Sequence, residues 1–282
     1  MEYIAMAVLV LATSLYIFDN YTVGTKIFRL KEKKIPRSFD GLRILHLSDL
    51  HNSNYGINND LLVKKINQLN PDLVFYTGDM VDERSTESSN FITLAKALSE
   101  KYPAYYVTGN HEDSLRQGDK NKLLAEVENL GINILHNEKI SLNRDGSEVN
   151  LYGLNLESKY YRKTYDRFTR ELQLSKEKLE EILGVKEAGY TMMLAHNPLY
   201  FDAYSAYGAD LIFSGHVHGG LIRLPIIGGI LSPDRFFNPK YDRGLFEDKG
   251  STMITSPGLG GIKFRFFNRP MIYLVVLESA QE

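Results

Sequence analysis

Histidine, aspartate and asparagine side chains are concentrated in five short motifs of this chain. Four motifs hold five of its seven histidines, and the fifth adds an aspartate. Neutral imidazoles, carboxylates and one amide oxygen form a mixed nitrogen and oxygen ligand set, which suits divalent transition metals better than calcium or an iron–sulfur cluster. The pattern therefore predicts metal chemistry. The motifs are Asp49-Leu50-His51, Gly78-Asp79, Gly109-Asn110-His111-Glu112, Ala195-His196-Asn197 and Gly215-His216-Val217-His218.

Each motif directly follows a short apolar segment that is typical of a buried strand. Sites in open α/β sheets lie outside the carboxyl ends of the strands, because adjacent strand ends bring distant parts of a chain together. We expect the five motifs to meet at such an edge, with Gly78, Gly109 and Gly215 allowing sharp exits from the strands. The apolar segments are residues 42–47, 73–76, 104–107, 192–194 and 211–213.

Strand-like and helix-like segments alternate in the first half of the chain, which is the signature of parallel βαβ units. Residues 139–142 and 148–154 flank Asp145-Gly146 and predict a hairpin. Strands near Met253 and over residues 272–277 lack intervening helices and indicate antiparallel additions. The interpretation is an α/β fold in which two mixed β-sheets pack face to face and are covered by helices.

The five motifs follow the pattern D-x-H, G-D, G-N-H-E, a lone histidine and G-H-x-H. In this respect the chain resembles the calcineurin-like metallophosphoesterase superfamily. Residues 215–225, 237–245 and 267–270 are similar to a bacterial membrane-linked branch and extend the resemblance almost to the C-terminus. The resemblance implies a four-layer αββα sandwich and the hydrolysis of phosphoric esters by two metal ions.

The resemblance also implies a role for each ligand candidate. Asp79 is expected to bridge the two ions, which offsets their mutual repulsion. A water between the ions then loses a proton near neutral pH, and the bridging hydroxide attacks phosphorus. Manganese, iron and zinc all accept this ligand set. The other expected ligands are Asp49, His51 and His218 at the first metal, and Asn110, His196 and His216 at the second.

Four further residues are assigned by position. His111 is expected to stabilise a phosphoryl oxygen or to protonate the leaving alkoxide, since imidazole has a suitable pKa. Asp82 is expected to orient this histidine, as an aspartate does in related phosphatases, although Glu83 stands where those proteins carry arginine. Glu112 is either an acceptor that fixes ligand geometry or a capping residue. Arg223 is expected to contact a substrate phosphate.

The N-terminal segment predicts a membrane anchor. Residues 3–18 are apolar and almost uncharged, and no basic stretch of a cleavable signal precedes them. Basic residues follow, which favours a catalytic domain on the cytoplasmic face by the positive-inside rule. We divide the chain into an anchor helix (residues 1–25), a basic linker (26–40) and a metallophosphoesterase domain (41–282). The alternative is a buried N-terminal helix of a soluble protein.

Composition narrows the set of partners. Charge is balanced, with 33 basic and 35 acidic residues, so no nucleic acid partner is expected. Cysteine is absent, which excludes disulfides and thiolate metal ligands. The sequence does not predict an oligomeric state.

The substrate is predicted from the anchor and from an apolar loop. Residues 221–231, with Phe236-Phe237, can dip into a bilayer or hold acyl chains, while Arg223 or Arg235 meets a phosphate. We therefore expect a phosphodiesterase that acts at the membrane lipid surface on a lipid or nucleotide-lipid phosphodiester. Packing of this loop in the core is the structural alternative. The functional alternatives are a tethered phosphatase or phosphodiesterase of soluble substrates, and a non-catalytic metal-binding scaffold.

Overall fold

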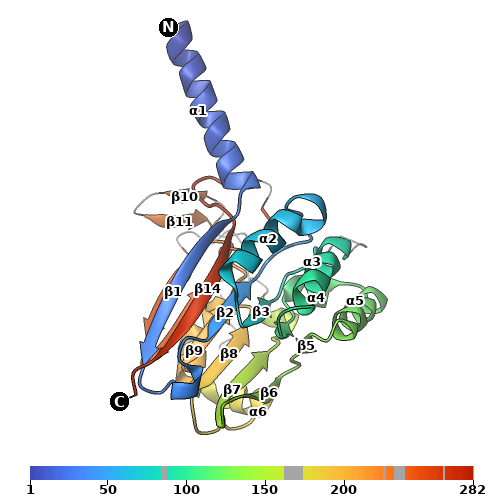
Figure 1. Cartoon of the computed structure of the whole chain (residues 1–282), viewed down its shortest axis with the longest axis vertical. Coiled ribbons are helices and arrows are strands. Elements are labelled where there is room, and N and C mark those ends of the chain that lie inside the picture. The colour runs from blue at the N-terminus through green and yellow to red at the C-terminus, as the bar shows by residue number, and fades with distance from the viewer. Residues whose placement is uncertain are drawn as a thin grey trace, which may run out of the picture.

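The fold is a sandwich of two sheets with helices on both outer faces (Figure 1). In the computed structural model, the described residues are 1–83, 88–161, 174–220, 222–224, 227–231, 239–262 and 264–281. Within these ranges the strands form two six-stranded mixed sheets and one two-stranded hairpin. The predicted four-layer αββα sandwich is confirmed.

The first sheet has the strand order β1-β14-β2-β3-β4-β5. Its strands β2 to β5 are parallel, β14 runs antiparallel to β2, and β1 pairs in parallel with β14. All five residues of β3 are buried, as expected for a parallel strand covered on both faces. The strands are β1 (Gly24–Glu32), β2 (Arg43–Leu47), β3 (Leu73–Thr77), β4 (Ala104–Val107), β5 (Asn133–Ile134) and β14 (Met271–Ser279).

The second sheet has the strand order β12-β13-β9-β8-β7-β6. The predicted hairpin is confirmed as β6 and β7, joined by Asp145 and Gly146 at φ 48° and 79°. The prediction that the strand near Met253 is an antiparallel addition to the sheet is correct for only one of its two neighbours. β13 is antiparallel to β12 but parallel to β9, because a tight turn after β12 reverses the chain. The strands are β6 (Glu138–Arg144), β7 (Ser147–Leu154), β8 (Thr191–Ala195), β9 (Leu211–Ser214), β12 (Gly244–Asp248) and β13 (Ser251–Thr255).

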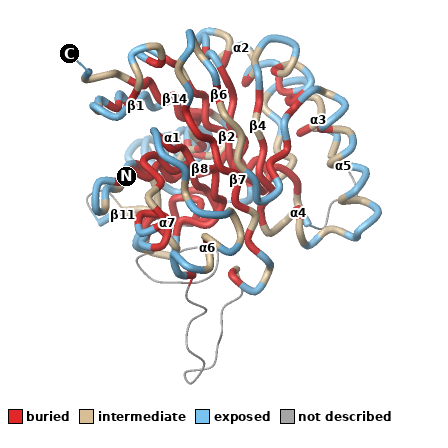
Figure 2. The backbone as a smooth tube through the Cα atoms, turned by 90° about the horizontal axis from the view of Figure 1, so that it is seen from below, coloured by how far each residue is buried: buried red, intermediate tan, exposed pale blue. Residues whose placement is uncertain are grey.

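Three hydrophobic cores separate the four layers. One lies between the two sheets, where Phe75 and Phe213 meet edge to face. The second joins the outer face of the first sheet to α2, α3 and α5, and the third joins the second sheet to α6 and α7. Figure 2 shows the resulting pattern, with buried central strands and exposed outer turns of the helices. The helices are α2 (Asp60–Leu69), α3 (Ser89–Ser99), α4 (Asn110–Ser114), α5 (Gln117–Asn129), α6 (Lys176–Leu183) and α7 (Phe201–Tyr207).

The N-terminal helix α1 (Glu2–Tyr21) projects from the body of the protein (Figure 1). Its 20 residues are long and apolar enough to cross a membrane, and among them only Asp19 is buried. A helix of this length spans about 30 Å, the thickness of the hydrocarbon layer of a bilayer. The alternative of a buried N-terminal helix is therefore wrong.

The segment predicted as a basic linker, residues 26–40, belongs to the folded body. Most of β1 lies in it, and a short 3-10 helix, Arg37–Phe39, follows. β1 pairs with β14 over all nine of its residues, so its backbone N–H and C=O groups are used in the sheet. The basic side chains Lys26, Arg29 and Lys31 stand on the exposed positions of this edge strand, which explains the polar appearance of the segment.

A loop attaches the end of α1 to the body of the protein, and a hairpin contacts this loop through a hydrogen bond from the Arg223 N–H to the Phe266 carbonyl oxygen (3.2 Å). The hairpin consists of β10 (Ile222–Leu224) and β11 (Gly228–Leu231). The loop, residues 257–262 and 264–270, is called the junction loop below. Asn20 in α1 accepts a hydrogen bond from the Arg265 backbone N–H (2.7 Å), and Asp19 accepts one from the Phe267 N–H (2.6 Å). The end of α1 is thus fixed to the body rather than freely hinged.

Candidate metal centre

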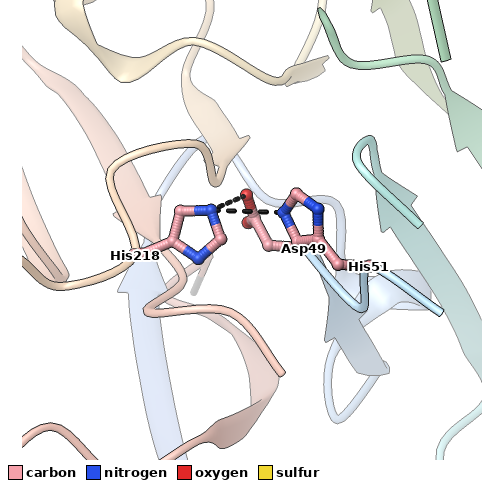
Figure 3. Close-up of side chains that lie close together, drawn as sticks. All are labelled: Asp49, His51 and His218. Atoms are coloured by element: carbon pink, nitrogen blue, oxygen red, sulfur yellow. Dashed lines mark hydrogen bonds and ion pairs between the residues drawn. The ribbon is translucent and has the colours of Figure 1, made fainter. Parts of the chain in front are cut away.

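Asp49, His51 and His218 form the first group of potential ligands (Figure 3). The first two follow β2, and His218 follows β9 in the other sheet. His218 Nε2 lies 3.3 Å from Asp49 Oδ1 and 3.3 Å from His51 Nε2. Nitrogen and oxygen lone pairs at this spacing converge on a space that suits one metal ion.

Asp79, His196 and His216 form the second group. His196 Nε2 lies 3.1 Å from Asp79 Oδ2, and the rings of His196 and His216 are 5.2 Å apart. The expected fourth member, Asn110, is the first residue of α4. These residues follow β3, β8, β9 and β4, so both sheets contribute strand ends to the site, as the sequence predicts.

Asp79 lies between the two groups. Its Oδ2 atom is 3.1 Å from His196 Nε2 and 3.9 Å from His51 Nε2, which belong to different groups. Asp49 Oδ1 approaches the second group as well, at 4.0 Å from His196 Nε2. The position of Asp79 agrees with the bridging role that the sequence predicts for it.

Five of the seven ligand candidates have backbones in the left-handed region. The φ angles are 51° for Asp49, 46° for His51, 53° for Asp79, 69° for His216 and 55° for His218. Side chains other than glycine rarely adopt this conformation, and each instance costs of order 1 kcal/mol. Such clustering of strained residues at one place is typical of a functional site.

Backbone carbonyls orient two of the histidines. The Thr77 carbonyl oxygen lies 2.5 Å from His196 Nδ1, and the Gly260 carbonyl oxygen lies 3.2 Å from His218 Nδ1. A proton on Nδ1 in these hydrogen bonds leaves the Nε2 lone pair facing the carboxylates. Contacts of this kind fix the tautomer of metal-binding histidines.

The glycines of the motifs are required for two different reasons. Gly78 has φ +83°, which favours glycine. Gly109 and Gly215 have ordinary φ angles but no space for a side chain. A Cβ atom would lie 2.3 Å from Asp79 Oδ1 at Gly109 and 2.2 Å from Asp49 Oδ2 at Gly215. The predicted sharp turn at the end of a strand therefore applies to Gly78. Gly109 and Gly215 instead allow the carboxylates of Asp79 and Asp49 to approach the backbone closely.

The electrostatics of the site favour a cation. Burial raises the pKa of Asp49 to about 6, and burial, followed by the charge of Glu112, raises that of Asp79 to about 7. Burial also lowers the pKa of His51 and His218 well below the ordinary value, so these imidazoles are neutral ligands. Buried carboxylates that hold protons this strongly gain from a bound cation, which replaces the proton.

An unpaired oxygen gives an independent test of the fit to metal ions. Asn110 Oδ1 is buried and has no hydrogen-bond partner among the described residues. Buried polar atoms are normally paired, so an unpaired amide oxygen beside a cluster of imidazoles and carboxylates fits a metal ligand. The side chains at this site can therefore hold divalent metal ions.

Glu112 holds the two motif loops of the first sheet together. Its carboxylate is fully buried and accepts four backbone hydrogen bonds. Oε2 accepts from the N–H groups of Asp79 and Gly109, both at 2.8 Å, and Oε1 accepts from Met80 (2.6 Å) and Val81 (3.2 Å). The contacts to Asp79, Met80 and Val81 favour the first predicted role, that of fixing ligand geometry.

His111 lies at the mouth of the site. Its backbone N–H donates to Asp79 Oδ1 (2.8 Å), and its Nε2 is 3.9 Å from Asp79 Oδ2. The Glu83 backbone N–H donates to His111 Nδ1 (3.1 Å), which leaves the ring proton on Nε2. A carboxylate oxygen of Asp82 and ring nitrogens of His51 and His111 lie within 4.8 Å of one another. The structure thus places Asp82 near His111, the predicted catalytic histidine. The backbone N–H of Glu83 contacts the His111 ring directly.

Arg223 lies in β10 and is already paired. Its guanidinium forms an ion pair with Asp242 and a hydrogen bond of 3.4 Å to the Gly219 carbonyl oxygen. These contacts brace the segment after His218, and the substrate role of Arg223 stays a prediction. Phe236-Phe237 and Arg235, assigned to the same apolar loop, lie outside the described residues.

Sequence reasoning missed the junction loop. A Cβ atom at Gly261 would lie 2.3 Å from His218 Cε1, and one at Gly258 would lie 2.7 Å from Asp49 Cβ. The Asn268 side chain donates to the carbonyl oxygens of His218 (2.7 Å) and Gly220 (2.5 Å). The available signal was the run Pro257-Gly258-Leu259-Gly260-Gly261, which follows β13 as the motifs follow their strands.

Fold and site together define a metal-dependent phosphoesterase of the αββα class. Residues 42–220 match the family model described as calcineurin-like phosphoesterase, and the chain belongs to this family. The resemblance inferred from the motifs is thereby confirmed, including its bacterial and membrane-linked character, since similar proteins of both kinds exist.

Three relatives illustrate the range of similar proteins. The uncharacterized metallophosphoesterase YkuE of Bacillus subtilis is 27% identical in an alignment that covers 93% of this chain and 87% of that protein. A transmembrane protein with metallophosphoesterase domain from Danio rerio is 30% identical in an alignment that covers 88% of this chain and 56% of that protein. The UDP-2,3-diacylglucosamine pyrophosphatase LpxG of Chlamydia muridarum is 26% identical in an alignment that covers 89% of this chain and 88% of that protein.

Proposed function

We propose that this enzyme hydrolyses a phosphodiester of a membrane lipid or of a nucleotide-linked lipid at the membrane surface. The observation that supports this best is that one loop contacts both the metal centre and the anchor helix. The junction loop packs its glycines against Asp49 and His218 and binds the end of α1 through backbone N–H groups. The centre therefore stays near the bilayer when α1 is inserted.

Two relatives support a lipid substrate. One is, by its name, a pyrophosphatase of UDP-2,3-diacylglucosamine, which is a nucleotide joined to an acylated sugar. Another is named as a transmembrane protein. A substrate with acyl chains presents its phosphate at the bilayer surface, where an enzyme anchored by α1 meets it without leaving the membrane.

The proposed ligands divide as the sequence predicts. Two bound divalent ions lower the pKa of water and neutralise charge on the phosphoryl oxygens. Asp79 lies between the two ligand groups and would contribute a carboxylate to both. Thr77 and Gly260 keep the Nε2 atoms of His196 and His218 turned toward the carboxylates. The metal sets are Asp49, His51, Asp79 and His218, and Asp79, Asn110, His196 and His216.

His111 supplies a hydrogen-bond donor to the phosphoryl group in this proposal. Its Nδ1 accepts from the Glu83 backbone N–H, so Nε2 carries the proton and faces the site. From there Nε2–H donates a hydrogen bond to a phosphoryl oxygen as negative charge develops on it, which is the first of the two roles expected for His111. Asp82, close to the same ring, orients it.

The catalytic body lies on the cytoplasmic side in this proposal. The supporting observation is the row of basic residues on the exposed positions of β1, which begins three residues after the end of α1. Basic residues next to a membrane helix are retained on the cytoplasmic face.

The decisive experiment is a substrate screen of the full-length protein in detergent with Mn²⁺. Substrates are a phospholipid, UDP-2,3-diacylglucosamine, bis(p-nitrophenyl) phosphate and p-nitrophenyl phosphate. We expect kcat/KM to be highest for a lipid-linked substrate. Equal activity on soluble esters would instead assign the enzyme to soluble substrates, and bound metal without cleavage of any of these esters would identify a non-catalytic metal-binding scaffold.

Three histidine variants test the site in the same assay. His216→Ala should lose bound metal, because a ligand is removed. His111→Ala should keep its metal while kcat falls about 10²- to 10³-fold, the usual contribution of one hydrogen-bond donor to a developing oxyanion. His136→Ala is the matched control, since His136 is exposed and belongs to no motif. Wild-type activity in the first two variants would refute the proposed site.

A further inference from the structure

A cavity of about 540 Å³ lies where α1 meets the body of the protein. The end of α1, the segment after His51, the start of α2 and the junction loop all line it. Its volume is in the range of small-ligand sites. None of the residues that carry the metal motifs lines it, so the cavity is distinct from the metal centre.

The charged side chains that line this cavity are all positive. Lys65, Arg265 and Arg269 line it, and no acidic residue does so in the described part of the chain. None of the three forms an ion pair with a described carboxylate. Arg265 is only 2% exposed, and its guanidinium donates hydrogen bonds to the carbonyl oxygens of Pro257, Gly260 and Asn268. A buried guanidinium whose N–H groups donate only to neutral carbonyl oxygens is costly, and an anion in the adjacent cavity would offset that cost.

The position of the cavity selects the kind of anion. The last residues of α1 and its connection to β1, from Asn20 to Val23, line the cavity. Since α1 is just long enough to cross the hydrocarbon layer, these residues lie at the depth of the lipid headgroups when it is inserted.

Aromatic side chains mark the same depth. Phe264, Phe266 and Phe267 of the junction loop are 54%, 39% and 40% exposed, and Phe264 stacks on Tyr16 of α1 with ring centroids 5.8 Å apart. Exposed aromatic residues next to a membrane helix are typical of the interface between the bilayer and water. These aromatic residues therefore agree with a position of the cavity at the depth of the lipid headgroups.

We propose that this cavity binds the phosphate headgroup of an anionic membrane lipid. Lys65 and Arg269 contact the phosphate, buried Arg265 adds its charge, and the acyl chains run beside α1 past the exposed phenylalanines. Basic pockets beside membrane helices are suited to anionic headgroups for this electrostatic reason. The proposal rests on insertion of α1, which is part of the proposed function, and it is independent of the substrate of the metal centre.

The bound lipid would also stabilise the attachment of α1. Arg269 donates to the carbonyl oxygens of Thr22 (3.2 Å) and Val23 (3.0 Å), and its guanidinium lies 4.3 Å from the ring centroid of Phe18. A phosphate that pairs with this guanidinium ties the headgroup, the helix end and the junction loop together. We therefore expect lipid binding to raise the melting temperature of the protein.

Lys64 and Lys65 allow a matched test. They are neighbours on α2, but Lys65 lines the cavity, whereas Lys64 is exposed and does not. The full-length protein in a non-ionic detergent with EDTA is titrated with dioctanoyl phosphatidylglycerol, and the melting temperature is followed. EDTA removes the metal ions, so that the metal centre does not contribute to phosphate binding. Saturable stabilisation gives an apparent dissociation constant.

We expect phosphatidylglycerol to stabilise the wild-type protein and dioctanoyl phosphatidylcholine to do so at least about tenfold more weakly. Lys65→Glu should weaken binding about tenfold, and Lys64→Glu should leave it within about twofold. If Lys65→Glu does not fold, Lys65→Gln should still weaken binding about threefold, because it removes one positive charge without adding a negative one.

Three results would overturn the proposal. Equal effects of Lys64→Glu and Lys65→Glu would place the lipid elsewhere. Equal stabilisation by phosphatidylcholine would exclude recognition of the anionic headgroup, and equal stabilisation by glycerol 3-phosphate would make the ligand a free phosphate. Because hydrolysis plays no part in this assay, failure of the lipid substrate screen would leave the cavity proposal standing, and the reverse also holds.

Discussion

Removal of the Glu112 carboxylate is the perturbation that tests the architecture of the site most directly. Glu112→Ala leaves four buried backbone N–H groups without the acceptor they have now. Each unsatisfied donor costs about 1–3 kcal/mol, and water entering the space lowers the sum. Loss of the repulsion between Glu112 and Asp79 offsets part of it. We expect a net destabilisation of about 4 kcal/mol, near the lower end of this range.

The assay is thermal unfolding of the metal-free protein, followed by metal titration. In a domain of this size 1 kcal/mol corresponds to about 2–4 °C, so the melting temperature of Glu112→Ala should fall by about 8–16 °C. Glu112→Gln keeps one acceptor oxygen and should lose about half as much. Metal affinity should fall about 10- to 100-fold in both variants, because Asp79 and the start of α4 lose their common support.

Glu128→Ala is the control, since Glu128 is an exposed acid on α5 and should change stability by less than about 0.5 kcal/mol. The reasoning fails if Glu112→Ala melts within about 3 °C of the wild type and binds metal within twofold. That result would mean that other acceptors hold the two loops.

Two further predictions concern a buried histidine and a glycine. Burial lowers the pKa of His46 to about 3, so the unfolded chain takes up a proton below about pH 6.5 and the folded protein does not. The free energy of unfolding should therefore fall as pH drops from 6.5 toward 3. In denaturant titrations, His46→Gln should reduce the slope of this free energy against pH by up to about 1.4 kcal/mol per pH unit. Identical slopes in the variant and the wild type would contradict this prediction. Gly261 has φ +78° and no room beside His218, so Gly261→Ala should weaken metal binding at least about tenfold by calorimetry, whereas Gly118→Ala, in open space, should leave it unchanged.

The strand ends could be predicted because each motif is adjacent in sequence to its own apolar segment. This local relation places Asp49 after β2, Asp79 after β3 and His216 after β9 without any knowledge of the sheet order. The residue types then define the chemistry, and the family resemblance supplies the role of each residue.

The supports of the site could not be predicted in the same way. Asn268 donates to the carbonyl oxygen of His218 across 50 residues, and β1 pairs with β14 across most of the chain. Glycine-rich segments such as 257–261 have no periodicity, so their sequence does not reveal which neighbour they touch. Basic residues on an edge strand resemble a linker, because such strands expose polar side chains on one face.

The short connection after α1 has a kinetic consequence. Only Thr22 and Val23 separate α1 from β1, and the Arg269 guanidinium holds the carbonyl oxygens of both. With α1 inserted as proposed, the catalytic body stays close to the bilayer surface, and its encounters with the proposed lipid substrate are confined to two dimensions. The rate then follows the mole fraction of substrate in the membrane rather than its bulk concentration. Adding inert lipid at constant total substrate slows such an enzyme by surface dilution, whereas a soluble ester is turned over at an unchanged rate.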